Sequence, residues 1–120
     1  MNGQKEGKMM KYEHLLSPMT IRGKVYRNRM IAAPTLFAHA VYFIPQIREN
    51  VYRMVECRAA GGFAAVSTGE LPVNFEEGIA AFVERAVDYS KYEGEDFEHT
   101  KEYANRIKKH GAISYLEFCQ

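Results

Sequence analysis

The chain has 120 residues, which is the length of a single domain, and 47% of them are hydrophobic and 26% charged. This composition excludes a disordered or collagen-like chain. Sixteen Lys and Arg residues against fifteen Asp and Glu residues leave a formal net charge of +1. We therefore expect neither nucleic acid nor a membrane as a partner, because both would require a clustered excess of basic residues.

Two cysteines, Cys57 and Cys119, lie far apart in the sequence and form no CxxC pair. We expect two free thiols in a cytoplasmic protein rather than a disulfide framework. No apolar stretch approaches the roughly 18 residues that span a bilayer, and the polar start of the chain lacks the apolar core of a secretory signal. Residues 1–13 are expected to form a disordered leader.

The first ordered elements are expected to be a hairpin and a strand. Residues 19–22 and 25–27 alternate in polarity around Gly23-Lys24, which predicts a β-hairpin with its turn there. Residues 30–33 are apolar and are followed by Pro34, which forbids helical continuation. We therefore predict a short buried strand over residues 30–33.

A helix is predicted next, beginning at Pro45 and ending before Gly61-Gly62, because proline favours the first turn and glycine the position just past the end. Its apolar positions follow helical spacing: Ile47, Val51, Met54, Val55 and Ala59. Residues 63–68 then predict a second apolar strand. Because a strand follows Gly61-Gly62, this pair is interpreted as a helix C-cap and not as a phosphate-binding loop, which would open a helix.

The same order repeats in the last part of the chain. Glu95-Asp96 suit a helix N-terminus, Gly111 suits its end, and the stripe between them is formed by Phe97, Ala104 and Ile107. Residues 112–118 predict a third strand. Strands that alternate with helices predict an α/β fold with a parallel sheet. Three such strands leave two open sheet edges, so the fold looks incomplete.

Ligands of parallel α/β folds bind at the carboxyl ends of the strands, which here are residues 34–36, 68–70 and 117–120. Small residues there would let a flat ring approach the backbone; on these residues alone, the simpler interpretation is that Gly69 makes a turn and Thr68 caps a strand. The loop at residues 89–96 could be solvated or could form a substrate lid in which Tyr89 or Tyr92 stacks on a flat ligand. The histidines share no ligand spacing with either cysteine, so no metal is expected: His14, His39, His99 and His110.

Several motifs in sequence order become specific when taken together. They are Leu-x-x-Pro at residues 15–18, Arg27-Asn28-Arg29, Ala32-Ala33-Pro34, Arg58-Ala59-Ala60-Gly61-Gly62 and His110-Gly111. With the hairpin, they resemble the amino-terminal part of the Old Yellow Enzyme family of NADH:flavin oxidoreductases, in particular the branch with 2,4-dienoyl-CoA reductase and 2-enoate reductase. The resemblance implies that residues 14–120 are part of an FMN-binding (β/α)8 TIM barrel, with about three of its eight strands.

The resemblance also implies cofactor-binding positions. Ala33, Pro34 and Thr35 match the segment that contacts the flavin after the first strand, and Gly69 matches the small residue after the second. Leu36 stands where many members have Thr or Cys bonded to the flavin O4. Glu117 stands where members have Gln at the pyrimidine edge, and its carboxylate would oppose negative charge on the reduced ring.

The implied activity is transfer of hydride from NADH or NADPH, through FMN, to a small unsaturated molecule. The catalytic residues of the family lie on later strands, so none is assigned here, and iron–sulfur cysteines would occur only in a longer chain. The alternative is a truncated or split barrel piece that self-associates or complements another chain. A barrel enzyme without flavin is a third interpretation.

Overall fold

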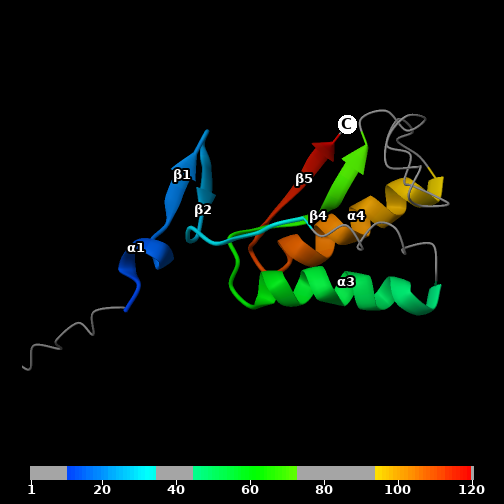
Figure 1. The fold of residues 1–120 in the computed structure, drawn as a ribbon, viewed down its shortest axis with the longest axis horizontal. Helices are drawn as coiled ribbons and strands as arrows, with labels where there is room; N and C mark the ends of the chain where they lie inside the picture. Colours follow the sequence, from blue (N-terminus) through cyan, green and yellow to red (C-terminus); the bar gives the residue numbers. More distant parts are fainter. Residues whose placement is uncertain (1–10, 35–44, 73–93, 120) are drawn as a thin grey trace, which may run out of the picture.

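The computed structural model describes residues 11–34, 45–72 and 94–119. Its elements follow one another as a short helix, a hairpin, and then strands that alternate with helices (Figure 1). Their bounds are α1 Glu13–Leu16, β1 Met19–Ile21, β2 Lys24–Tyr26, β3 Ile31–Ala32, α3 Pro45–Ala60, β4 Ala65–Pro72, α4 Gly94–Lys108 and β5 Ile113–Cys119.

The described strands form an antiparallel hairpin, β1-β2, and a parallel sheet of three strands in the order β3-β4-β5. Ala32 lies opposite Val66, and Val66 lies opposite Ser114, so one row of residues crosses the whole sheet. This confirms the α/β class and the parallel pairing expected from the alternation of helices and strands. The strands β4 and β5 run on well beyond the end of the two-residue strand β3.

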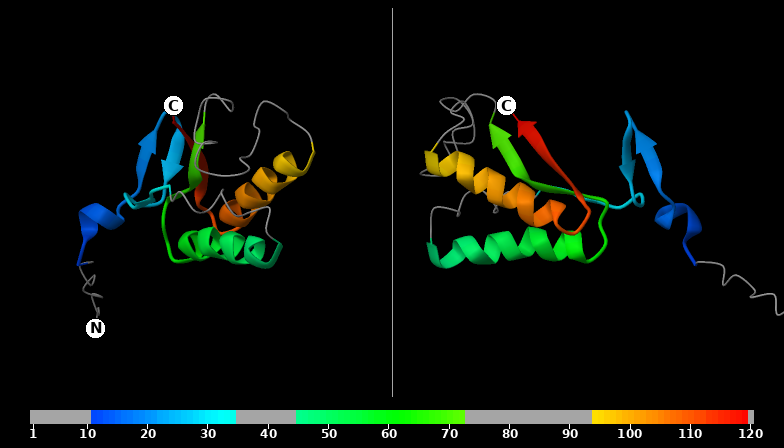
Figure 2. Two further views of the ribbon diagram at one scale, coloured as in Figure 1. Left: turned by 45° about the vertical axis from the view of Figure 1, so that its right-hand side comes forward. Right: turned by 180° about the vertical axis from the view of Figure 1, so that it is seen from behind.

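Both long helices lie on the same face of the sheet, side by side (Figures 1 and 2). The core is formed where they meet it, by Ala32, Val51, Tyr52, Val55, Ala59, Val66, Tyr103, Ile107 and Ala112. The predicted helical stripes are confirmed at their centres, but Ile47 and Phe97 are each 38% exposed. The buried face of α4 also contains His99 and Tyr103, which the sequence did not single out.

Glycine ends both helices, as predicted. At the end of α3, the N–H of Phe63 donates to the Arg58 carbonyl and that of Gly62 to the Ala59 carbonyl, while Gly62 has a φ of 108°. These two bonds define a Schellman motif, which confirms that Gly61-Gly62 is a C-cap. Gly111 follows α4 with a φ of 73°.

The hairpin turns one residue earlier than predicted. Arg22 and Gly23 both have positive φ, 47° and 77°, and Lys24 already belongs to β2. Two such residues make the turn that matches the twist of antiparallel strands, so the geometry selects Arg22-Gly23 over Gly23-Lys24. Residues 11–12 form a turn and Glu13 opens α1, although they were placed in the expected leader; residues 1–10 lie outside the described chain.

The charged residues before β3 tie the start of the sheet together. The Arg27 guanidinium donates to three carbonyls from separate segments: Ala59 at 2.6 Å, Phe63 at 2.7 Å and His110 at 2.8 Å. Buried Asn28 donates to the Gly62 carbonyl at 2.7 Å and accepts from the Met30 N–H. The polar side chains just before β3 therefore donate hydrogen bonds to backbone carbonyls at the ends of the two long helices, which have no partner within their helix.

Strand bounds differ from the predictions by a few residues. Strand β3 is shorter than residues 30–33, and β4 extends from Ala65 to Pro72 instead of residues 63–68. Strand β5 begins and ends one residue later than predicted. None of the helices that the structure describes combines the length and the apolar character needed to cross a bilayer.

Candidate functional site

The three parallel strands run towards the same edge of the sheet, as expected from the parallel order, but their carboxyl ends are staggered. Ala33 and Pro34 directly follow β3, whose last residue pairs with Val66 of β4, whereas Glu117 lies near the end of β5 opposite Glu70, farther along the sheet. Ala33 is exposed and Pro34 is half-buried. A small exposed residue followed by a proline leaves the backbone of this segment accessible to a flat ligand.

The other predicted positions fall on β4, on β5 or outside the described chain. Gly69 lies inside β4, at an irregular step where β4 advances from Ser67 to Glu70 while β5 advances from Tyr115 to Glu117. This step is a β-bulge, a feature often found next to functional sites. Glu117 is exposed and lies opposite Glu70 in the register. Thr35 and Leu36 lie outside the described residues.

One residue of this edge was missed by sequence reasoning. Tyr115 of β5 donates its hydroxyl hydrogen bond to the carbonyl oxygen of Ala32, at 3.0 Å, although β5 and β3 are not neighbours in the sheet. Its register partner is Ser67 of the intervening strand β4, which is completely buried. Alternation along β5 places Tyr115 on the same face as Glu117, and this signal could have identified it.

The phenol of Tyr115 is held in its protonated state. Burial raises its pKa above the ordinary value of 10.0, and the negative charge of Glu117 and the nearby Tyr26 act in the same direction. A protonated phenol is a hydrogen-bond donor at neutral pH, so its bond to the Ala32 carbonyl persists over the whole physiological range.

The described part of this edge has an apolar segment and, farther along the sheet, a carboxylate. Exposed Ala33 and half-buried Pro34 offer an apolar surface, and the exposed Glu117 offers a carboxylate acceptor on the strand two places away. An isoalloxazine ring needs such a flat apolar contact on one side and hydrogen-bond partners along its polar edge.

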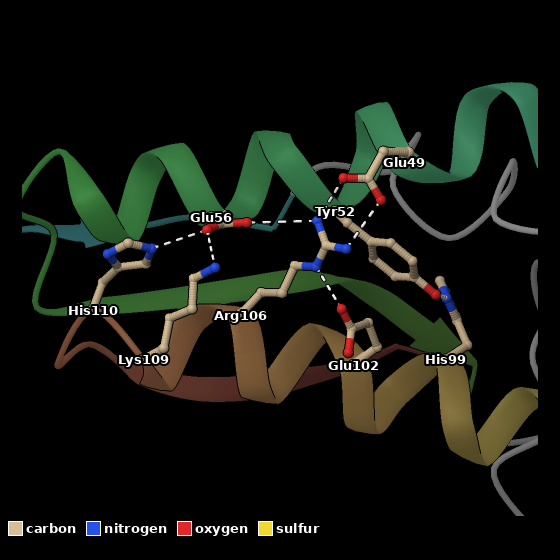
Figure 3. A network of polar contacts seen from close by, with 8 residues as sticks. All are labelled: Glu49, Tyr52, Glu56, His99, Glu102, Arg106, Lys109 and His110. Atoms are coloured by element: carbon tan, nitrogen blue, oxygen red, sulfur yellow. Dashed lines mark hydrogen bonds and ion pairs between the residues drawn. The ribbon is translucent and has the colours of Figure 1, made fainter.

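A second group of polar residues lies between α3 and α4 (Figure 3). At its centre Arg106 donates to both carboxylate oxygens of Glu49, at 2.7 and 3.0 Å, and to Glu102 at 2.5 Å. These hydrogen bonds raise the pKa of Arg106 and lower that of Glu49. The guanidinium carbon also lies 5.0 Å from the centre of the Tyr52 ring, a cation–π distance.

Glu56 joins this group to the end of α4. Its carboxylate is paired with Lys109, lies 3.1 Å from His110 Nε2 and 3.5 Å from Arg106. Hydrogen bonds from Lys109 and His110 lower the pKa of Glu56 from 4.5 to about 2. The carboxylate is therefore ionised throughout the physiological range.

Buried rings continue the contact between the helices. The hydroxyl of Tyr52 lies 2.7 Å from His99 Nδ1, and the ring of Tyr103 packs edge-on against both. Burial raises the pKa of Tyr52. The aromatic cluster and the ion pairs together join α3 to α4 behind the sheet, so we interpret them as structural.

The remaining chemical candidates lie partly on the two helices α1 and α3 and partly outside the described residues. Cys57 is exposed on α3, and His14 is exposed in α1. His39 and the loop residues Tyr89 and Tyr92 lie outside the described chain. Within residues 11–34, 45–72 and 94–119, no three His, Cys, Asp or Glu side chains are grouped so that they could hold a metal ion.

Comparison with known proteins identifies the fold but no family. No family model matches the sequence, and no curated protein matches it. Among solved structures, the chain is similar to 6-hydroxypseudooxynicotine amine oxidase (HisD) from Pseudomonas geniculata N1, with a TM-score of 0.70 and 21% sequence identity. The similarity covers 91% of this chain but 15% of that one, and at this identity it shows the fold alone.

Proposed function

We propose that this chain is the amino-terminal segment of an FMN-dependent oxidoreductase barrel, of the ene-reductase type. The observation that carries the proposal is that Ala33 and Pro34 directly follow one strand, and Glu117 lies near the end of another, in a sheet whose strands run parallel. The family resemblance assigns flavin contacts to these positions. The solved structure to which the chain is similar is named as an amine oxidase, and at 21% identity the likeness supports the fold that the proposal requires.

Each residue of the edge would have a distinct part in holding the cofactor. Ala33 and Pro34 would lie against the flat face of the ring, because they are small or rigid and at least partly accessible. The bulge at Gly69 would keep the middle strand clear of the ring. Glu117 would accept a hydrogen bond from the ring N3–H.

The carboxylate of Glu117 would also affect the redox balance. A negative charge beside the ring opposes the gain of further negative charge, so Glu117 would lower the reduction potential relative to a neutral amide. When bound, FMN would supply hydride transfer between NADH or NADPH and a small unsaturated substrate. The chain spans 15% of the length of the amine oxidase. The hydride-transfer activity is therefore proposed for a complete barrel protein, of which this chain would form one part.

The test is a titration of the desalted full chain with FMN, followed by visible absorption and flavin fluorescence. We expect saturable binding that shifts the flavin spectrum and is weakened by Ala33→Leu, whose larger side chain would occupy the space of the ring. The matched control is Ala60→Leu, which enlarges another exposed alanine at the end of α3. An unchanged flavin spectrum, or equal affinities of the two variants, would refute a flavin site at this edge.

A second candidate function is assembly without activity. Ile31 is 52% exposed and Phe118 is 58% exposed, and β3 and β5 are the outer strands of the described sheet. Strand edges with exposed apolar side chains favour pairing with another chain. Self-association without any flavin binding would support this candidate over the first.

A further inference from the structure

We infer that Tyr115 is a positioning residue that fixes the carboxyl end of β3, and with it the Ala33-Pro34 segment. Its effect on cofactor binding rests on the proposed function. Its effect on the backbone of β3 stands independently, because it follows from the hydrogen bond between the Tyr115 hydroxyl and the Ala32 carbonyl.

Strand β3 needs such support because its own ladder is short. It pairs with β4 at two positions, Ile31 with Ala65 and Ala32 with Val66. Pro34 has no N–H to donate, so the ladder cannot be extended through this residue. The segment that would contact the flavin therefore begins where strand pairing stops.

Tyr115 supplies a contact from beyond the neighbouring strand. It lies opposite Ser67 in the register between β4 and β5, and its hydroxyl reaches the carbonyl of Ala32 on the far side of β4. The small side chain of Ser67, completely buried, leaves room for this crossing. One side chain thus joins the two outer strands of the described sheet.

Tyr115 is the donor and the Ala32 carbonyl the acceptor of this hydrogen bond at every physiological pH. The raised pKa of Tyr115 keeps the phenol protonated, and the Ala32 carbonyl can only accept. The charges of Glu117 and Tyr26 also raise the pKa of Tyr115 and so favour the neutral phenol. A bridge of this kind holds the end of β3 in place without depending on a titrating partner.

The test compares Tyr115→Phe with Tyr26→Phe in the full chain. The first variant removes only the hydroxyl that binds Ala32 and keeps the aromatic ring at the position opposite Ser67. The second removes a hydroxyl that acts on Tyr115 electrostatically but leaves its hydrogen bond in place. Far-UV circular dichroism and thermal unfolding would first establish that both variants fold.

Two measurements then separate the structural claim from the cofactor claim. The first is the carbonyl-carbon NMR resonance of Ala32, observed through the Ala33 amide, which we expect to move upfield in Tyr115→Phe and to stay in place in Tyr26→Phe. The second is FMN affinity, which we expect to fall about three- to tenfold in Tyr115→Phe, the range for losing one hydrogen bond, with a changed spectrum of bound flavin.

The outcomes are distinct. An unchanged Ala32 resonance in Tyr115→Phe would overturn the inference, independently of the measured FMN affinity. A shifted resonance with unchanged FMN affinity would overturn the claim that the bridge positions the flavin-contacting segment. If the unmodified chain binds no FMN, the proposed function fails, and the Ala32 resonance still decides whether Tyr115 fixes the end of β3.

Discussion

The Arg27 side chain forms hydrogen bonds with backbone carbonyls of three separate segments. Its guanidinium donates to carbonyls at the end of α3, before β4 and after α4, and it does so from the hairpin side of β3. Several donors in one rigid plane allow these bonds to form together, which a lysine ammonium cannot reproduce. The planar arrangement of donors in the Arg27 guanidinium therefore matters more than its positive charge.

We predict that Arg27→Lys destabilises the chain by about 1–3 kcal/mol, because most of these charge-assisted bonds are lost while the charge remains. The measurement is the urea midpoint of unfolding. Arg29→Lys, an identical change two residues later at an exposed side chain, serves as the control. Equal midpoints for the two variants would show that the carbonyl contacts add no stability.

Glu117 allows a functional prediction at the same scale. In the FMN-loaded chain, Glu117→Gln should raise the flavin reduction potential by about 20 mV, which corresponds to about 1 kcal/mol for a charge at an exposed position. Spectroelectrochemical titration would measure it. Glu13→Gln, on exposed α1, should leave the potential unchanged; a fall in the Glu117→Gln variant would contradict the assigned orientation of the ring.

The sequence predicted the positions of some residues in the fold but missed the hydrogen bonds of others, for a physical reason. It placed Ala33, Pro34 and Glu117 near strand ends because apolar runs and glycines locate the strands, but it did not reveal how far the strand ends are staggered. It missed the roles of Arg27 and Tyr115. Alternation along β5 could have placed Tyr115 on the face of Glu117, but the partners of both side chains are backbone carbonyls, which every residue carries and which the sequence therefore does not mark. The separation of Tyr115 from Ala32 by 83 residues adds to the difficulty.

At the scale of elements, the contact between α3 and α4 combines a buried aromatic cluster with ion pairs at its surface (Figure 3). The ion pairs are pH-sensitive through Glu56, whose pKa is lowered from 4.5 to about 2. A carboxyl group with a lowered pKa in the folded state stabilises that state above its unfolded pKa, and this stabilisation is lost as the pH falls.

We predict that stability falls as the pH is lowered from about 4.5 towards 2, the window given by the two pKa values of Glu56. Glu56→Gln should lower stability at neutral pH and flatten the decline within this window. Urea unfolding at a series of pH values would measure both effects. The control is Glu98→Gln, since Glu98 forms a mostly exposed pair with Lys101 within α4; the same flattening in both variants would contradict the assignment.

Elements were predicted well where apolar spacing and glycine coincide. The bounds of α3 agree with the pattern, and Val51, Val55 and Ala59 form its buried face as expected. On α4 the pattern was incomplete, because it left out His99, a polar residue, and Tyr103, an aromatic one, which are both buried in ring contacts with Tyr52. The four-residue helix α1 has no buried residue and hence no apolar pattern that could predict it.

For the molecule as a whole, the helices cover one face of the described sheet (Figure 2). Ile31 alternates along β3 with the buried core residue Ala32, so it lies on the opposite face, where it is 52% exposed. We predict that the chain associates in solution to cover this surface and the edge of β5. Light scattering over a range of concentrations should detect species larger than the monomer. Phe118→Lys, which places a charge on the edge strand, should shift the equilibrium towards the monomer.

The matched control is Tyr12→Lys, which changes an exposed aromatic residue just before α1, outside the three-stranded sheet. Association that responds equally to both substitutions would show that the contact is not made by the sheet. A monomer at all concentrations, unfolding cooperatively, would refute the prediction and show that the exposed strands are tolerated in isolation.

The position of Arg27 also has a consequence for the order in which the chain folds. One of its carbonyl partners, His110, lies 83 residues later in the sequence. During synthesis the hairpin emerges before α4. The carbonyl of His110, to which Arg27 donates, is added only after α4 has ended and before β5 begins. Docking of the hairpin is therefore expected to be a late event, limited by the closure of a long loop.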